Sequence, residues 1–317
     1  MNDAQSFISC QWCPRQCGVD RQRGETGFCG ETAQLRVAAI EAHFGEEPPI
    51  SGMHGSGTVF FSGCTLQCDF CQNYQLSHLH FGEQMTVAAV VERLATLYRT
   101  QGIHNVNFVT PDHFFPYTVA IMAALRQKNT PLPSVYNLSG YERVDALRQI
   151  EAAADIYLPD FKYADRELGA LLSHCRDYPA VALDAIAEMV RQKGFLDSFL
   201  AEEPERLAQR GVLVRHLILP GQTANSLAAL DMLFLEFGKN LPLSLMSQYH
   251  PVRPCPVPGL DRRITTEEFQ QVHDHALSLG FQHVFVQYPE NEPPQAPEFL
   301  PDFTQARPFQ GNVRPPL

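Results

Sequence analysis

The chain has 317 residues, of which 44% are hydrophobic, so it is long enough to bury a full core. It carries 24 Lys and Arg against 35 Asp and Glu, a formal net charge of −11, and an acidic chain of this kind repels phosphate backbones, so we expect no nucleic-acid surface. It contains no apolar stretch of about 18 residues and starts with MNDAQSFISC, which lacks the regions of a signal peptide, so we expect no membrane span and a cytoplasmic location.

The chain divides into three regions by composition. Residues 1–57 form a Cys-rich metal-binding module with a connector, residues 58–287 a regular core, and residues 288–317 a Pro-rich tail that is extended or disordered. The prolines and glycines of residues 31–57 predict irregular, tightly turned backbone for the connector.

From residue 58 onward, short apolar runs typical of buried strands alternate with longer stretches of helical spacing. In chain order, strands are predicted over 58–63, 105–110, 134–138, 155–161, 212–219, 243–248 and 283–287. Helices are predicted over 86–101, 115–128, 142–154, 179–193, 225–238 and 265–280. Such alternation produces parallel strands with right-handed crossovers. We therefore predict an α/β fold, either a partial (β/α)6 TIM-like barrel or a strongly curved sheet, with its chemistry at the C-terminal ends of the strands.

The helix boundaries have local signals. Thr86 is a suitable N-cap for the first predicted helix. Thr265 and Glu268 have the spacing of a capping box, and Gly280 follows that helix as a stop signal.

The first predicted core strand leads into GCTLQCDFCQN, with the spacing Cys64-x3-Cys68-x2-Cys71. Seven of the nine cysteines lie between Cys10 and Cys71, and in a reduced compartment this clustering favours metal over disulfides. Three thiolates on one loop can hold three corners of a 4Fe–4S cubane, whereas a ferredoxin supplies a fourth cysteine. The iron left without a protein ligand can bind the amino and carboxylate groups of S-adenosylmethionine (SAM). A zinc knuckle or three buried thiols are the alternative interpretations.

Several segments together resemble the radical SAM family of proteins related to pyruvate formate-lyase activating enzymes: GTVFFSGCTLQCDFCQN, GIHNVNFVTPDHFFP, VYNLSGYE, DIYLPDFKY and HLILPG. The resemblance runs from Cys10 to about Gln287. It implies that the cluster cleaves SAM reductively to a 5′-deoxyadenosyl radical, which abstracts hydrogen from a substrate. The chain departs from the genuine activases after the second strand, where their Gly-Gly-Glu is replaced by Thr110-Pro111-Asp112-His113.

The resemblance also implies residues of a SAM site. Phe70 matches an aromatic residue beside the adenine, and backbone carbonyls near Thr110 can accept from the SAM amino group. Lys162 is expected to pair with the SAM carboxylate, and Asp160 to bind a ribose hydroxyl, a cation or substrate. Asn137 and Ser139 match positions that line the SAM pocket, and Arg215 and His250 match positions near the SAM ribose or adenine. A structural ion pair of Asp160 with Lys162, an internal salt bridge of Arg215 and a packing role for His250 stay open.

A second set of thiols has the spacing Cys10-x2-Cys13-x3-Cys17-x11-Cys29. Four thiolates within this span can hold structural zinc or an auxiliary iron–sulfur cluster, and we slightly favour zinc. Cys255, after the sixth strand, is a candidate hydrogen-atom donor, although a buried free thiol is the simpler interpretation. Glu46 and Glu47, in HFGEEPP, can cap the barrel mouth, contact substrate or be solvated.

These observations favour a radical SAM enzyme that receives electrons from a donor such as flavodoxin or ferredoxin. Two reaction classes are open: activation of a glycyl radical enzyme, and radical modification of a small molecule or another peptide. A non-enzymatic iron–sulfur carrier is the rival interpretation, which the resemblance at Phe70, Asp160 and Lys162 disfavours because a carrier needs no SAM pocket.

Overall fold

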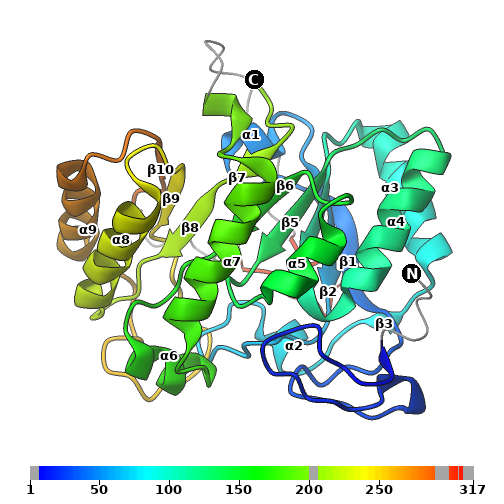
Figure 1. Cartoon of the computed structure of the whole chain (residues 1–317), viewed down its shortest axis with the longest axis horizontal. Coiled ribbons are helices and arrows are strands. Elements are labelled where there is room, and N and C mark those ends of the chain that lie inside the picture. Colours follow the sequence, from blue (N-terminus) through cyan, green and yellow to red (C-terminus); the bar gives the residue numbers. More distant parts are fainter. Residues whose placement is uncertain (1–6, 200–205, 290–299, 306, 310–317) are drawn as a thin grey trace.

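Seven strands form the larger of two sheets in the computed structural model, which describes residues 7–199, 206–289, 300–305 and 307–309 (Figure 1). The strand order is β3 (Glu83–Gln84), β1 (Arg36–His43), β2 (Ser56–Phe61), β4 (Val106–Val109), β5 (Ser134–Leu138), β6 (Ile156–Pro159) and β7 (Gly211–Val212). Strands β2 to β7 are parallel, whereas β1 is antiparallel to both of its neighbours. The smaller sheet has the order β10 (Val284–Val286), β9 (Leu243–Met246), β8 (Val214–Leu217) and is fully parallel.

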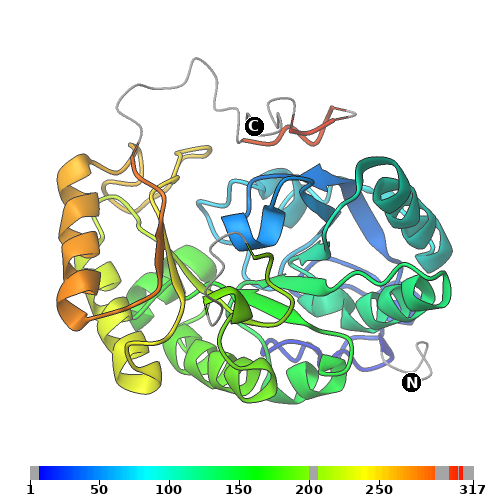
Figure 2. The ribbon, with the colours of Figure 1, turned by 90° about the horizontal axis from the view of Figure 1, so that it is seen from above.

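The two sheets meet at one isolated parallel bridge, between Asp160 after β6 and Arg215 in β8. Seen from above, they stand opposite each other with helices on their outer sides (Figure 2). The prediction of an α/β fold with mostly parallel strands is therefore confirmed. The strands form two hydrogen-bonded sheets joined by this bridge, and not one continuous six-stranded barrel sheet.

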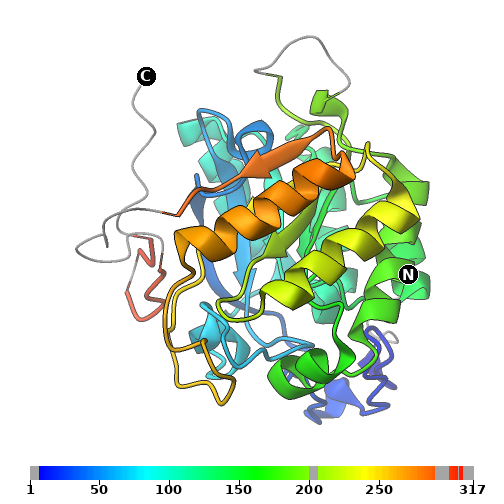
Figure 3. The same ribbon diagram turned by 90° about the vertical axis from the view of Figure 1, so that its left-hand side faces the viewer.

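The six predicted helices are all present, with ends shifted by a few residues. They are α3 (Val87–Gln101), α4 (Phe115–Gln127), α5 (Val144–Ile150), α7 (Tyr178–Lys193), α8 (Thr223–Phe237) and α9 (Thr266–Leu279). The Thr86 side chain caps α3, and Thr265 with Glu268 forms the expected capping box of α9. Helices α8 and α9 lie side by side on the outer face of the smaller sheet (Figure 3).

The remaining helices are short. They are α1 (Pro48–Ser51), α2 (Tyr74–Ser77), α6 (Arg166–Ser173) and the 3-10 turns Arg21–Arg23, Asp112–Phe114 and Asp197–Phe199. No helix within the described ranges is long and apolar enough to cross a membrane.

The prediction of irregular backbone over residues 31–57 is wrong at β1. This strand pairs with β2 from Val37 opposite Phe61 to His43 opposite Ser56. Its buried positions do not alternate cleanly along the strand, so the period-2 signal of a strand is weak. Instead, β1 is stabilised by hydrogen bonds to β2, which follows it after a turn-rich connection. The three-region division itself stays a prediction.

The two faces of the larger sheet differ in polarity. Alternate residues of a strand point to opposite faces. On the outer face, Phe61, Phe108, Tyr136 and Tyr157 join the main apolar core with residues of α3, α4 and α7. The opposite face carries polar side chains at Thr58, Asn107 and Asn137, on the adjacent parallel strands β2, β4 and β5, with Thr58 paired to Asn107 and Asn137 paired to Val109. The interior between the two sheets is therefore partly polar, and a ligand can make hydrogen bonds there.

We expect Gly140→Ala to destabilise the fold strongly. Gly140 has φ +82°, and a Cβ there would lie 2.1 Å from the carbonyl oxygen of Asp160 and 2.6 Å from the hydroxyl of Tyr178. Steric overlap and left-handed backbone together should cost about 2–5 kcal/mol of unfolding free energy. Gly280→Ala is the control, since Gly280 has φ +93° with nothing within 4 Å and should cost only about 1–2 kcal/mol. Equal losses for both variants in urea unfolding would contradict this account.

Candidate functional site

Cys64, Cys68 and Cys71 lie on the loop that follows β2. Gly63 enters this loop with φ +80°, and a Cβ there would lie 2.6 Å from the carbonyl oxygen of Cys29. Cys64 and Cys68 are buried and Cys71 is partly exposed. The Cys68 sulfur accepts a hydrogen bond of 2.9 Å from the Ser173 hydroxyl. A tightly turned loop thus holds the three sulfur atoms in one region.

The protonation of these thiols depends on what they bind. Burial raises the pKa of Cys64, and the charges of Cys68 and Cys71 raise it further. Burial likewise raises the pKa of Cys68 and of Cys71, while the Lys162 ammonium opposes the shift at both. Three thiolates here need a positively charged partner, which fits a metal cluster. Among the described residues, no three His, Cys, Asp or Glu side chains have the spacing for a single metal ion, and a cubane is a larger body than one ion.

The three cysteines line a cavity of about 630 Å³ between the two sheets. Ligand pockets commonly measure about 300–1,000 Å³. The structure brings all of the sequence-predicted SAM-site residues to the wall of this one cavity: Phe70, Thr110, Asn137, Ser139, Asp160, Lys162, Arg215 and His250. Their roles toward a ligand stay predictions, but their convergence around the cysteines is a property of the fold.

A largely buried ion-pair network, whose side chains are 7–15% exposed, crosses the cavity wall. Asp160 pairs with Lys162 through Oδ2 and with Arg215 through Oδ1, the latter at 3.0 Å. Arg215 also donates to Glu46 Oε2 at 3.1 Å and to Asn137 Oδ1 at 2.6 Å. Burial alone would raise the pKa of Asp160, but the charges of Lys162 and Arg215 outweigh it and lower the pKa. Asp160 is therefore ionised, and the internal salt bridge considered for Arg215 is present.

Glu46 and Glu47 are on the cavity wall, although their pattern in the sequence left a solvated role open. The Glu46 side chain is 7% exposed and accepts from Asn107 and Asn137 as well as Arg215. No local motif signals this placement, because the partners of Glu46 come from three strands that are distant in the sequence.

Two features beside the cluster loop were not predicted. The Phe70 ring lies 6.1 Å from the ring of Tyr249, and both rings line the cavity. Thr110 has φ +53°, which is unusual for a β-branched residue. Strained backbone of this kind often occurs at functional sites, and here it follows β4, directly at the cavity.

Cys255 is partly exposed and does not belong to the described residues that line the cavity. Burial raises the pKa of its thiol, so it is protonated at neutral pH. Its predicted role as hydrogen-atom donor stays a prediction. His250 does line the cavity, and burial together with the Arg263 charge lowers its pKa, so its imidazole is neutral there.

In the N-terminal module, Cys10, Cys13 and Cys29 are buried and Cys17 is exposed. Burial raises the pKa of Cys13 to about 12 and that of Cys29 to about 11, and the charge of Cys10 acts on both. The Cys17 sulfur accepts from the backbone N–H of Phe28 at 3.3 Å. Cys10, Cys13 and Cys29 therefore lie close enough for the charge of one to affect the pKa of another. The second metal site stays a prediction.

The module contacts the cluster loop directly. Arg15 Nε donates to the carbonyl oxygen of Thr65 at 3.0 Å, and the Gln67 amide donates to that of Phe28 at 2.6 Å. In Figure 1 the module is the dark blue segment below α2. It therefore covers one side of the loop that carries Cys64, Cys68 and Cys71.

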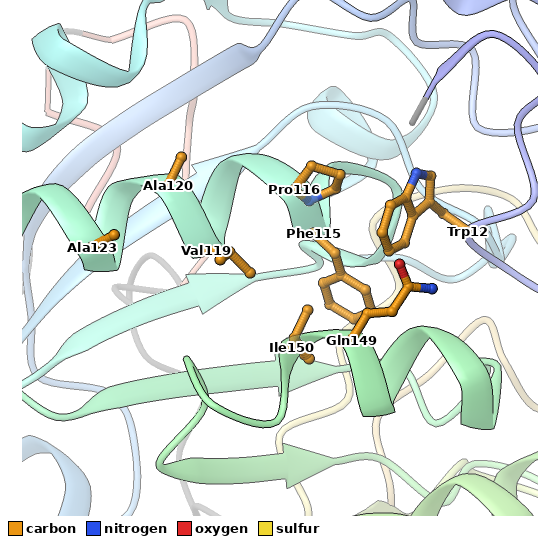
Figure 4. A pocket seen from close by; sticks show the side chains of 8 residues that line it. All are labelled: Trp12, Phe115, Pro116, Val119, Ala120, Ala123, Gln149 and Ile150. Carbon is orange, nitrogen blue, oxygen red and sulfur yellow. The ribbon is translucent and has the colours of Figure 1, made fainter. Parts of the chain in front are cut away.

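A smaller cavity of about 240 Å³ lies between α4, α5 and Trp12 (Figure 4). Its walls are almost entirely apolar: Trp12, Phe115, Pro116, Val119, Ala120, Ala123, Gln149 and Ile150. These side chains include no titratable or nucleophilic group, so this cavity offers no chemistry of its own.

Comparisons with known proteins agree with an iron–sulfur site in the larger cavity. Residues 51–160, which include Cys64, Cys68 and Cys71, match the family model of a 4Fe-4S single cluster domain. The chain is 27% identical over 288 residues to the uncharacterized protein MJ0674 of Methanocaldococcus jannaschii, covering 88% of this chain and 77% of that protein.

Two solved structures were also compared. The crystal structure of SuiB from Streptococcus suis has a TM-score of 0.50 at 9% identity, over 74% of this chain and 48% of that one. HydG, a maturase of the [FeFe]-hydrogenase, has a TM-score of 0.49 at 15% identity, over 74% and 51%. The chain spans about half the length of both proteins. The family model supports a 4Fe–4S cluster within residues 51–160, and the likeness to SuiB shows a shared α/β fold.

We expect Arg215→Ala to cost about 3–5 kcal/mol of unfolding free energy, because it leaves the buried carboxylate of Glu46 without its cation. Arg93→Ala is the control: Arg93 is 52% exposed and pairs with Glu83, which is 61% exposed, so its loss should cost less than about 1 kcal/mol. Urea unfolding of both variants measures the difference. Similar losses would show that the buried network does not stabilise the fold.

Proposed function

We propose that this protein is a radical SAM enzyme in which Cys64, Cys68 and Cys71 hold a 4Fe–4S cluster. The observation that carries the proposal is the convergence of three thiols, two of them buried, and a charged, partly polar wall on one cavity of about 630 Å³. When bound, the cluster supplies an electron that cleaves SAM to a 5′-deoxyadenosyl radical, which abstracts hydrogen from a substrate. The protein binds, orients and shields these groups.

Each wall residue has a role in this proposal. Lys162 binds the SAM carboxylate, and Asp160 holds the ammonium group of Lys162 in position through their ion pair. The backbone carbonyl at the strained turn of Thr110 accepts from the SAM amino group. Phe70, beside Tyr249, packs on the adenine. The residues that surround the ribose and adenine are Asn137, Ser139, Arg215 and His250.

The finer assignments rest on the sequence resemblance. We propose that the two sheets act as a partial (β/α)6 barrel around SAM, and that a flavodoxin or ferredoxin supplies the electron. Activation of a glycyl radical enzyme is the finer functional proposal, with modification of a small molecule or another peptide as its alternative. The N-terminal module holds zinc or an auxiliary cluster on Cys10, Cys13, Cys17 and Cys29.

The first test replaces the cluster ligands. Cys64→Ala, Cys68→Ala and Cys71→Ala should each abolish 5′-deoxyadenosine release from the reduced, anaerobically reconstituted protein, because two thiolates leave the cluster labile. Cys175→Ala is the control, since Cys175 is a buried thiol near Cys68 that does not line the cavity and contacts the carbonyl oxygen of Gly169. Wild-type rates in any of the three variants would refute the proposal.

A variant with Cys64, Cys68 and Cys71 all replaced by Ala tests which metal the N-terminal module binds. Metal analysis of the variant lacking all three loop cysteines should find only metal bound elsewhere. Zinc near one per chain would support a structural site, and iron with sulfide near four per chain would support an auxiliary cluster.

Lys162→Ala should weaken SAM binding about 10- to 150-fold, the loss of one charge-assisted contact of about 1.5–3 kcal/mol. The melting temperature should change little, because Arg215 still pairs with Asp160 in the variant. Lys128→Ala is the control, as Lys128 is 50% exposed on the surface. Calorimetric titration with SAM and thermal melts measure both quantities. Normal SAM affinity with a much lower melting temperature would show that Lys162 is structural.

A further inference from the structure

The buried network on the cavity wall has more acids than bases. Its carboxyl groups are Glu46, Glu47 and Asp160, and its cations are Lys162 and Arg215. Arg263 also lines the cavity, but it acts on His250. Buried charges are stable when they are paired, and an ionised Glu47 has no cation of its own among these groups.

The carboxyl group with one oxygen left unpartnered belongs to Glu47, whose side chain also interacts with the Ser244 hydroxyl and the Arg215 charge. Both oxygens of Glu46 accept hydrogen bonds, from Asn107 and Asn137 at Oε1 and from Arg215 at Oε2. Both oxygens of Asp160 are paired as well. Glu47 Oε2 is buried and accepts from no donor among the described residues. A buried carboxylate oxygen that lines a cavity in this state needs a donor from a ligand.

The backbone holds Glu47 in place for such a ligand. Glu47 is the N-cap residue of α1, but its side chain makes no capping hydrogen bond, and Pro48 and Pro49 follow it. Proline restricts both its own φ and the conformation of the residue before it. The two prolines therefore restrict the backbone at Glu47, and its carboxyl group lines the cavity without capping α1.

We propose that Glu47 binds a positively charged nitrogen, an ammonium or guanidinium group, of the substrate that enters this cavity. The inference rests on the proposed function, since it names the substrate class of the same site. A cation there neutralises the third carboxylate and supplies the missing donor to Oε2. A charge-assisted hydrogen bond of this kind orients the substrate as well as binding it.

A series of charged side chains connects Glu47 with the cysteine loop. Cys68 interacts electrostatically with Lys162, Lys162 pairs with Asp160, and Asp160 pairs with Arg215. Glu47 interacts with Arg215 and Glu46 at the far end of this series. Glu47 is therefore linked to Cys68 through Arg215, Asp160 and Lys162 on the wall of the same cavity.

Burial raises the pKa of Glu47, and the Glu46 charge raises it further against the opposing Arg215 charge. A folded pKa above the usual value means that the free site holds a proton at pH values where an exposed glutamate does not. Because a cation favours the carboxylate, its binding should release this proton to the solvent.

The test uses propylguanidinium as probe and propylurea, its neutral analogue, in calorimetric titrations of the full-length protein. The wild type should bind propylguanidinium at least tenfold more tightly than propylurea. Glu47→Gln, which keeps the shape but not the charge, should lose this preference. Glu236→Gln is the control, because Glu236 is exposed on α8, and should keep it.

Titration of the wild type in two buffers of different ionisation enthalpy adds a measurement that needs no variant. Proton release on binding propylguanidinium supports the proposal, and equal affinity for the two probes overturns it. An unchanged preference in Glu47→Gln overturns it as well. SAM binding and iron content, measured on the same samples, test the proposed function separately: a wild type without cluster or SAM affinity refutes that function, while the probe titrations still report on Glu47.

Discussion

The contact between Asp160 and Arg215 joins the two halves of this structure. Their backbones form the isolated bridge between the sheets, and their side chains form an ion pair at 3.0 Å. Arg215 extends this contact to Asn137 and Glu46, so one guanidinium group connects both sheets and the segment before α1. A planar group with five donors suits this position better than a lysine would. The shape of the cavity depends on this cluster of charges.

The strand alternation explains why a cavity can exist there. Large aromatic residues of the parallel strands pack under the helices as part of the main core. The other face carries Thr58, Asn107 and Asn137, which cannot form a dry core without hydrogen-bond partners. Glu46 satisfies two of these amides and itself becomes part of the wall. The interior is stabilised by polar contacts, which leaves room and partners for a ligand.

The N-terminal module makes hydrogen bonds to the cysteine loop and to the segments beside it. Arg15 binds the carbonyl oxygen of Thr65 and those of Ser173 and His174 at the end of α6. Arg21 is buried and donates to the carbonyl oxygen of His113. The ring of His113 in turn contacts the carbonyl oxygen of Ser62. These contacts attach the module to the start of the cysteine loop and to the segments at His113 and at the end of α6. Changes in the module should therefore alter the loop that carries Cys64, Cys68 and Cys71.

The sequence by itself determined the features that depend on neighbouring residues: the spacing of Cys64, Cys68 and Cys71, the alternation of strands and helices, and the caps at Thr86 and Thr265. Resemblance to a family added the positions of Lys162 and Arg215. Only the tertiary structure decided that β1 joins the main sheet, that the strands form two sheets, and that Glu46 and Glu47 line the cavity. These features depend on contacts between segments far apart in the chain, such as Glu46 with Arg215, and no local period or spacing encodes such a pair.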